Sequence, residues 1–125
     1  MNRTVRFTIG DEVLEAQWGD SPTADALYDA LPLDERGSYW GDEFYFDTPV
    51  KMDAESGASD VVEPGAVAYW PPGSCLCIFW GPTPVSEGDE CRAANPVNVV
   101  GHIDDLEALG RLRSSAVRVE THDLQ

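Results

Sequence analysis

Two cysteines one residue apart, Cys75 and Cys77, lie in the stretch of this sequence with the least ordinary composition, VAYWPPGSCLCIFWGPTP. Thiolates bind zinc readily, and Cys91 would supply a third ligand, but structural zinc sites usually space their cysteines as Cys-x2–4-Cys. Apolar neighbours such as Leu76 and Ile78 raise the pKa of a thiol rather than lowering it, and free cysteines commonly fill cores. We therefore predict packed, reduced thiols, with no metal and no cofactor.

Aromatic side chains are the stronger candidates for a binding site. Tyrosine and tryptophan combine a large apolar area with a polar tip, which suits a ligand pocket. Six aromatic residues in the later strand-like segments are the ones to consider: Trp40, Tyr45, Tyr69, Trp70, Phe79 and Trp80. Of these, we interpret Phe79 and Trp80 as core residues. We take the other four, Trp40, Tyr45, Tyr69 and Trp70, as ligand-binding candidates. Tyr69 and Trp70 precede a Pro-Pro turn, where a strand ends and a pocket can open.

Three polar residues could line the same pocket. Asp42 and Glu43 are adjacent and face opposite sides of a strand, which argues against a pair of catalytic carboxylates, so Glu43 alone is kept, beside Tyr45. Thr83 stands in a rigid Gly-Pro-Thr-Pro loop that would leave it exposed at a rim. His102 lies in an apolar strand, where a lone histidine is more often structural than catalytic. The sequence holds no phosphate loop and no nucleophile–histidine–acid order, and we predict no catalytic residue.

The charge balance is the strongest compositional signal. The chain has 125 residues, 23 acidic and 8 basic, and a net charge of −15, with the acids scattered along its length. Such a charge destabilises a compact state unless salt screens it, and scattered acid with a single lysine is typical of proteins that work in molar salt. An ordinary acidic domain with a basic partner is the alternative. Nucleic acid is excluded as a partner, because there is no basic patch to neutralise phosphates.

The length predicts a single domain over residues 1–125. No apolar run approaches the roughly 20 residues of a membrane-spanning helix, and the first ten residues lack the apolar stretch of a signal peptide. An odd number of cysteines suits a reducing compartment. We expect a soluble cytoplasmic protein without a membrane partner.

Residue patterns predict about eight short strands and two short helices. An N-terminal hairpin joins 4–9 to 12–18 through Gly-Asp. Ser21 caps a helix with Pro22 at its first position, and Asp104 with Glu107 has the spacing of a capping box for the second helix. Further strands are expected at 39–46, 66–70, 75–80, 97–103 and 116–122. Two isolated amphipathic helices could cover the open ends of a closed barrel, and we therefore expect a mainly β fold of that kind.

Three segments in order resemble a cyclophilin: the hairpin and Pro-x-Ala helix, the stretch EPGAVAYWPPGSCLCIFW with its Gly-Ser turn, and VNVVGHIDDLEAL. The segments WGDEFYF, IFWGPTP and VNVVGHI are similar to the short, atypical cyclophilin-like family of prokaryotes. This resemblance covers most of the chain. It implies a closed eight-stranded cyclophilin-like β-barrel capped by two short α-helices.

The resemblance does not imply prolyl isomerase chemistry. Where cyclophilins have Gly-Ser-Gln-Phe-Phe-Ile, this chain has Gly-Ser-Cys-Leu-Cys-Ile, so Cys75 and Cys77 replace the glutamine and the pocket phenylalanine. The histidine position holds Val97, and no arginine occurs from Ser38 to Cys91, where the catalytic one should fall. The resemblance therefore places Cys75 and Cys77 in the wall of a pocket that lacks the catalytic set.

We expect a non-catalytic binding module for a small molecule or an extended peptide. Two other interpretations remain open: a prolyl isomerase with a rebuilt site, and a structural protein whose aromatic residues are buried in a homodimer or a larger complex.

Overall fold

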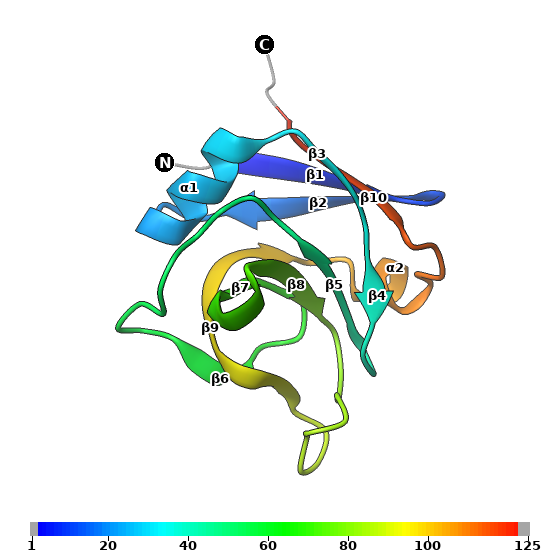
Figure 1. Cartoon of the computed structure of the whole chain (residues 1–125). Coiled ribbons are helices and arrows are strands. Elements are labelled where there is room, and N and C mark those ends of the chain that lie inside the picture. Colours follow the sequence, from blue (N-terminus) through cyan, green and yellow to red (C-terminus); the bar gives the residue numbers. More distant parts are fainter. Residues whose placement is uncertain (1–2, 123–125) are drawn as a thin grey trace.

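The computed structural model describes residues 3–122. This part of the chain forms ten strands, two α-helices and one short 3-10 helix (Figure 1). In chain order they are β1 (Arg3–Ile9), β2 (Glu12–Trp18), α1 (Pro22–Ala30), β3 (Leu33–Arg36), β4 (Ser38–Tyr39), β5 (Glu43–Asp47), β6 (Ser59–Val62), β7 (Ala66–Trp70), η1 (Pro71–Gly73), β8 (Cys75–Phe79), β9 (Cys91–Ile103), α2 (Leu106–Gly110) and β10 (Ala116–Thr121). Within residues 3–122, neither helix has the length and apolar character needed to cross a bilayer.

The N-terminal elements form as their residues predict. β1 pairs with β2 in an antiparallel hairpin, and Gly10 turns the chain with a φ of +60°. Ser21 caps α1, because its side chain accepts the Ala24 backbone N–H, and Pro22 takes the first helical position. The second helix differs from the expectation: Asp105, not Asp104, accepts the Ala108 N–H and acts as the cap.

The expectation of a closed eight-stranded barrel is wrong. The hydrogen-bonded strands follow one another in the order β3-β10-β1-β2-β9-β7-β8-β5-β4, with β6 pairing to β9 beside this path. The path is open, because no pairing among the described residues joins its end strands, β3 and β4. These two strands are consecutive in the chain and meet at Gly37, where a Cβ would lie 2.3 Å from Cζ of Phe44.

The structure has more strands than expected for two reasons. One expected strand is divided into two, and two short strands form where the sequence has no alternating apolar pattern. The expected strand 39–46 is interrupted at Gly41, whose φ is +64°, and becomes β4 and β5. β3 has one buried residue in four and β6 also has one, so neither carries an alternating apolar signal. β9 begins at Cys91, six residues before the expected strand, and includes Pro96.

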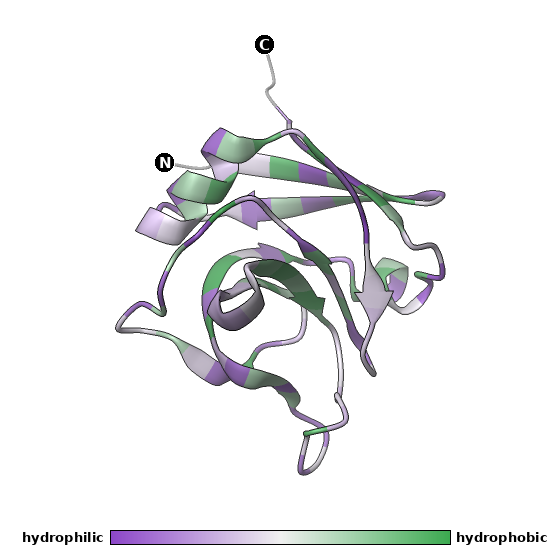
Figure 2. Ribbon diagram, in the orientation of Figure 1, coloured by the Kyte–Doolittle hydropathy of each residue, from purple (hydrophilic) through white to green (hydrophobic). Residues whose placement is uncertain are grey.

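Two separate cores lie on the two faces of the central strands. The larger core contains alternate residues of β5, β7 and β8, and the apolar side chains of α1 and α2 pack into it. The two helices lie on opposite sides of the molecule (Figure 1). The smaller core holds Cys75, Cys77 and Phe79 from β8, together with residues of β6, β7 and β9. β8 is therefore buried on both faces, which explains its continuous hydrophobic sequence (Figure 2).

β9 pairs with different strands along its length, and this brings β6 beside the smaller core. Its C-terminal half pairs with β2 and β7, while its N-terminal half pairs with β6. Pairing with β6 jumps from Arg92 to Val97, so residues 93–96 leave the regular ladder. This irregular segment curves around β7 and β8 (Figure 1).

A buried amide ties the long loop after β5 to the rest of the fold. Asn98 accepts the Glu55 backbone N–H at 2.8 Å and donates from Nδ2 to the hydroxyl of Thr23 and to the Asp53 carbonyl, both at 3.0 Å. The Thr23 backbone N–H donates in turn to the Glu55 carboxylate at 2.9 Å. These bonds join α1, β9 and the loop.

Candidate functional site

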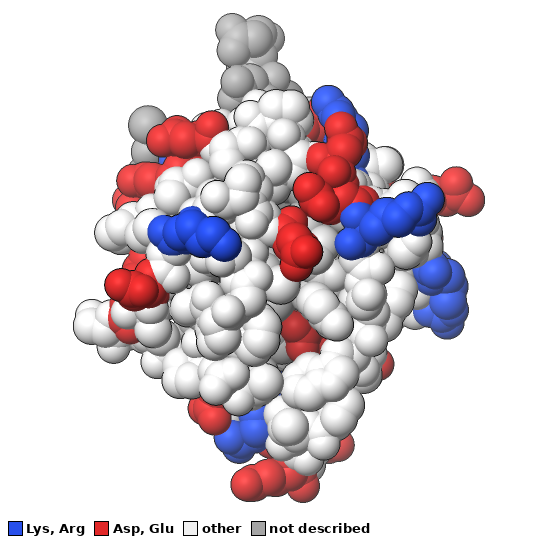
Figure 3. Space-filling view, viewed as in Figure 1, with Lys and Arg blue, Asp and Glu red and all other residues white. Residues whose placement is uncertain are grey.

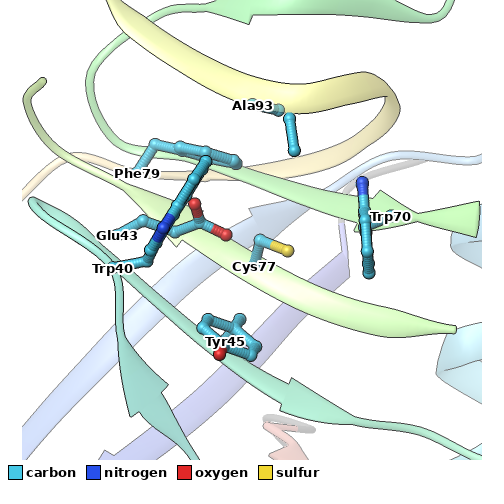
Figure 4. A pocket seen from close by; sticks show the side chains of 8 residues that line it. Trp40, Glu43, Tyr45, Trp70, Cys77, Phe79 and Ala93 are labelled. Atoms are coloured by element: carbon cyan, nitrogen blue, oxygen red, sulfur yellow. The ribbon is translucent and has the colours of Figure 1, made fainter. Parts of the chain in front are cut away.

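A pocket of about 210 Å³ opens on the side of the sheet that faces the smaller core. Its wall consists mostly of aromatic and small apolar side chains, with one carboxylate and one thiol (Figure 4). The lining residues are Trp40, Glu43, Tyr45, Trp70, Cys77, Phe79, Ala93 and Ala94. At roughly 30 Å³ for each water, the space matches a ligand group of several heavy atoms.

Strand alternation explains why these residues meet. On β5, Phe44 and Phe46 point into the larger core, so Glu43 and Tyr45 point to the opposite face. Glu43 is the register partner of Phe79, and Tyr45 is the partner of Cys77. The neighbouring strands β5 and β8 therefore present alternate side chains to one surface.

Trp40 is held at the edge of the pocket by a tight turn. Its backbone N–H donates to the Glu43 carbonyl at 2.9 Å, and the Asp42 N–H donates to the Pro82 carbonyl at 2.9 Å. Gly41 has a left-handed backbone here, and a Cβ on it would lie 2.8 Å from the Pro82 oxygen. The Gly81–Pro84 loop thus supports the turn that carries Trp40.

Trp70 forms the opposite side of the pocket (Figure 4). Its indole N–H donates to Asn95 Oδ1 at 3.2 Å, which links the ring to the irregular segment of β9. The ring lies against Gly73, where a Cβ would approach to 2.4 Å. One edge of the Trp70 ring is therefore linked to β9, and its six-membered ring lies close to Gly73.

Glu43 is the unusual group of the site. Only 5% of the residue is exposed, and its carboxyl group points into the pocket between Trp40 and Cys77 (Figure 4). Its Oε1 atom has no hydrogen-bond partner among residues 3–122. Burial raises the pKa of Glu43 to about 7, although the hydrogen bond from the Cys77 thiol opposes this increase.

The cysteines lie in apolar or acidic surroundings. Burial, with the Glu43 carboxylate beside it, raises the pKa of Cys77 well above its usual value. Burial and Asp47 raise the pKa of Cys75 to about 12. Burial also raises the pKa of Cys91. All three are free, and within residues 3–122 no group of three cysteine, histidine or acidic residues is arranged to hold a metal ion.

The structure brings together five of the nine predicted site residues and separates the other four. Trp40, Glu43, Tyr45, Trp70 and Cys77 line the pocket. Cys75 also lies in the smaller core, but its thiol contacts Asp47 and the Gly73 carbonyl, each at 3.4 Å. His102 is half exposed, with Nε2 at 3.0 Å from the Asp104 carboxylate.

Thr83 and Tyr69 are both engaged in structural hydrogen bonds. Thr83 was expected to be exposed, but it is only 6% exposed, and its hydroxyl donates to the Arg92 carbonyl. Tyr69 is fully buried in the larger core. Its hydroxyl donates to the Val50 carbonyl at 2.6 Å and accepts the Met52 N–H at 3.2 Å.

Replacing Tyr69 with phenylalanine is expected to lower the free energy of unfolding by about 1–3 kcal/mol, because two buried backbone groups lose their partner. Ligand binding should be unchanged, since the side chain lies on the other face of β7. Chemical denaturation measures the effect, and Tyr45→Phe, which removes the hydroxyl of a half-buried tyrosine, is the matched control. Equal stability of the two variants would contradict the structural role of Tyr69.

Three lining residues were not among the sequence candidates. Phe79 could have been found, because it shares strand parity with Cys77 on a strand buried on both faces. Ala93 and Ala94 gave no signal, because they shape the pocket by their small size and lie in a segment that resembles a loop.

Comparison with known proteins agrees with this architecture. The family model described as cyclophilin-like matches residues 3–120. The chain therefore belongs to the cyclophilin-like family. A hypothetical protein from Archaeoglobus fulgidus, known from its solution structure, is 36% identical, with a TM-score of 0.82 over 97% of this chain and 95% of that chain. No curated protein matches the chain.

Proposed function

We propose that this protein is a non-catalytic binding module whose pocket between Trp40 and Trp70 takes an apolar group of a ligand. The observation that carries this proposal is the pocket itself, which is preformed, lined by four aromatic rings, and contains one carboxylate with an unpaired oxygen. Ligand sites generally combine an apolar wall with few polar groups in this way.

The lining residues also support the non-catalytic part of the proposal. Prolyl isomerisation benefits from a donor that stabilises the twisted amide, and none of the eight lining residues is arginine, glutamine or histidine. We expect no acceleration of isomerisation in a proline-peptide assay. An acceleration that Trp70→Ala abolishes would contradict this expectation.

The four tryptophan indole N–H signals provide a direct test of binding. In an NMR titration with 3,3-dimethylbutan-1-ol, a compact apolar probe, we expect shifts of the Trp40 and Trp70 signals. Trp18 serves as an internal control, because it is buried and its N–H donates to the Ala24 carbonyl at 2.9 Å. Trp80 lies outside the pocket and is a second control.

Two variants complete the test of the pocket. Trp70→Ala should weaken binding of the probe about tenfold or more, because burial of an aromatic face is lost. Trp80→Ala removes the same side chain outside the pocket and should leave the affinity unchanged. Uniform shifts of all four signals, or no response up to saturating probe, would overturn the proposal.

A further inference from the structure

We propose that the pocket recognises an alkylated ammonium group, with Glu43 as its counter-ion and the surrounding rings as an aromatic cage. The inference rests on the proposed function and names the chemistry of the ligand that this pocket would take. It is carried by the position of one buried carboxyl group within four aromatic side chains.

The lining carries one acid and no base. Apart from Glu43, only Cys77 and Tyr45 can titrate among the eight residues, and the strand β9 contributes two alanines. Cys75 lies further along β8 and adds no positive charge. A buried carboxylate without a cation is unfavourable, because its negative charge has lost water and gained only the hydrogen bond from the Cys77 thiol. A ligand cation would compensate that charge.

The aromatic side chains supply the remaining stabilisation. Trp40, Tyr45, Trp70 and Phe79 surround the carboxyl group, and Figure 4 shows the two tryptophan rings on opposite sides of it. The negative faces of aromatic rings attract cations, most strongly for tryptophan and when water is excluded. Asn95 and Gly73 hold the Trp70 ring in place before a ligand arrives. The preformed geometry reduces the entropy lost on binding.

The scarcity of hydrogen-bond acceptors favours an alkylated group over a primary ammonium. A primary ammonium brings three N–H donors, and a buried donor without an acceptor is costly. The Glu43 carboxyl and the Tyr45 hydroxyl are the oxygen-bearing side chains of the wall, while aromatic, alanine and thiol groups form the rest. An ammonium that carries methyl groups has at most one N–H to satisfy and fills the apolar space.

Four probes separate charge from shape. Choline and N,N-dimethylethanolamine carry alkylated ammonium groups, ethanolamine carries a primary one, and 3,3-dimethylbutan-1-ol replaces the choline nitrogen with carbon. At pH 8 and fixed salt, we expect choline and N,N-dimethylethanolamine to bind about tenfold more tightly than the other two. Calorimetry or the Trp40 and Trp70 indole signals can measure the affinities.

Proton linkage gives a second, independent readout. The cation requires ionised Glu43, and the pKa of this residue is raised to about 7. The choline affinity should therefore fall about tenfold from pH 8 to pH 6, while that of the uncharged isostere stays constant. Glu43→Gln should abolish both the preference for choline and its pH dependence. Glu35→Gln, which removes an exposed carboxylate outside the pocket, should change neither.

The outcomes distinguish this inference from the proposed function. Equal affinities for choline and 3,3-dimethylbutan-1-ol would overturn the cation site and leave the apolar pocket standing. If none of the probes bound, both the cation site and the proposed binding function would be wrong. A preference for choline that persists in Glu43→Gln would overturn the role of the carboxylate.

The alkylated ammonium could belong to a free metabolite or to a methylated lysine side chain. A short peptide with one trimethyllysine, compared with choline and with the unmodified peptide, distinguishes these sources. Tighter binding of the modified peptide assigns a protein ligand, and tighter binding of choline assigns a small molecule. If removal of the methyl groups from the peptide leaves its affinity unchanged, and choline fails to bind, the inference is wrong.

Discussion

Replacement of Glu43 with glutamine is expected to stabilise the protein above neutral pH. The pKa of this carboxyl is raised to about 7 in the folded protein, chiefly because it is buried, against an ordinary value of 4.5. The folded state therefore holds the proton more tightly than the unfolded state. This contribution to stability is fully present below pH 4.5 and is lost as the pH rises through 7.

The full difference corresponds to about 3 kcal/mol, at 1.36 kcal/mol for each pH unit between the two pKa values. Glutamine does not titrate, so the free energy of unfolding of Glu43→Gln, relative to the original protein, should increase by about this amount from pH 4.5 to pH 8. Denaturant titrations at several pH values measure the difference. Glu35→Gln, which also removes one negative charge, should show a small and nearly constant difference.

A pH-independent difference for Glu43→Gln would show that the carboxyl has an ordinary environment. The expected result would have a clear functional meaning, because an acid that destabilises its own fold when ionised is a typical cost of a binding site. A bound cation would supply the positive charge that ionised Glu43 lacks in the free protein.

The second large effect concerns salt. Figure 3 shows acidic side chains distributed over the drawn face, and the chain carries a net charge of −15. Repulsion among these charges acts over roughly 10 Å at 0.1 M salt but over only about 3 Å at 1 M. We expect the protein to lose its circular dichroism signal as potassium chloride is lowered from about 2 M to about 0.1 M.

Neutralisation of unpaired surface acids tests the cause of this expected unfolding. Asp20, Asp29, Glu35 and Asp89 are exposed and form no ion pair within residues 3–122. A variant with all four replaced by the corresponding amides should stay folded to a lower salt concentration. A fold that persists at 0.1 M salt would contradict the expectation of halophilic behaviour.

Local signals were sufficient to predict the parts of this fold that are specified by a few neighbouring residues. Gly10 identified the turn of the first hairpin, and Ser21 with Pro22 identified the start of α1. The strand β8 was evident from its continuous apolar residues. In each case the deciding interaction joins residues close together in the sequence.

Features that depend on distant partners could not be predicted in this way. β3 has only Leu33 buried, and its pairing with β10 involves residues eighty or more positions away. The early start of β9 was hidden by Asn95 and Pro96, which are typical of loops. The open strand order follows from these pairings, so neither the number of strands nor closure could be read from local patterns.

The residues of the candidate site also divide into those that local patterns predict and those that depend on distant contacts. Resemblance and strand alternation suggested Cys77, Tyr45 and Glu43, because these residues lie on one face of adjacent strands. Whether Tyr69 or Trp70 reaches the pocket depends on which face of β7 each occupies, and a continuous apolar strand does not reveal this. The structure buries Tyr69 in the larger core and leaves Trp70 at the pocket.

The irregular segment of β9 has a consequence for how this family could diversify. Ala93 and Ala94 lie where β9 leaves its regular pairing with β6, and both line the pocket, Ala93 as a buried residue and Ala94 as an exposed one. Larger residues there would shorten the cavity, and the aromatic walls on the other strands would remain in place. Under the function that we propose, changes at these two positions would alter the size of the accepted group without altering Glu43.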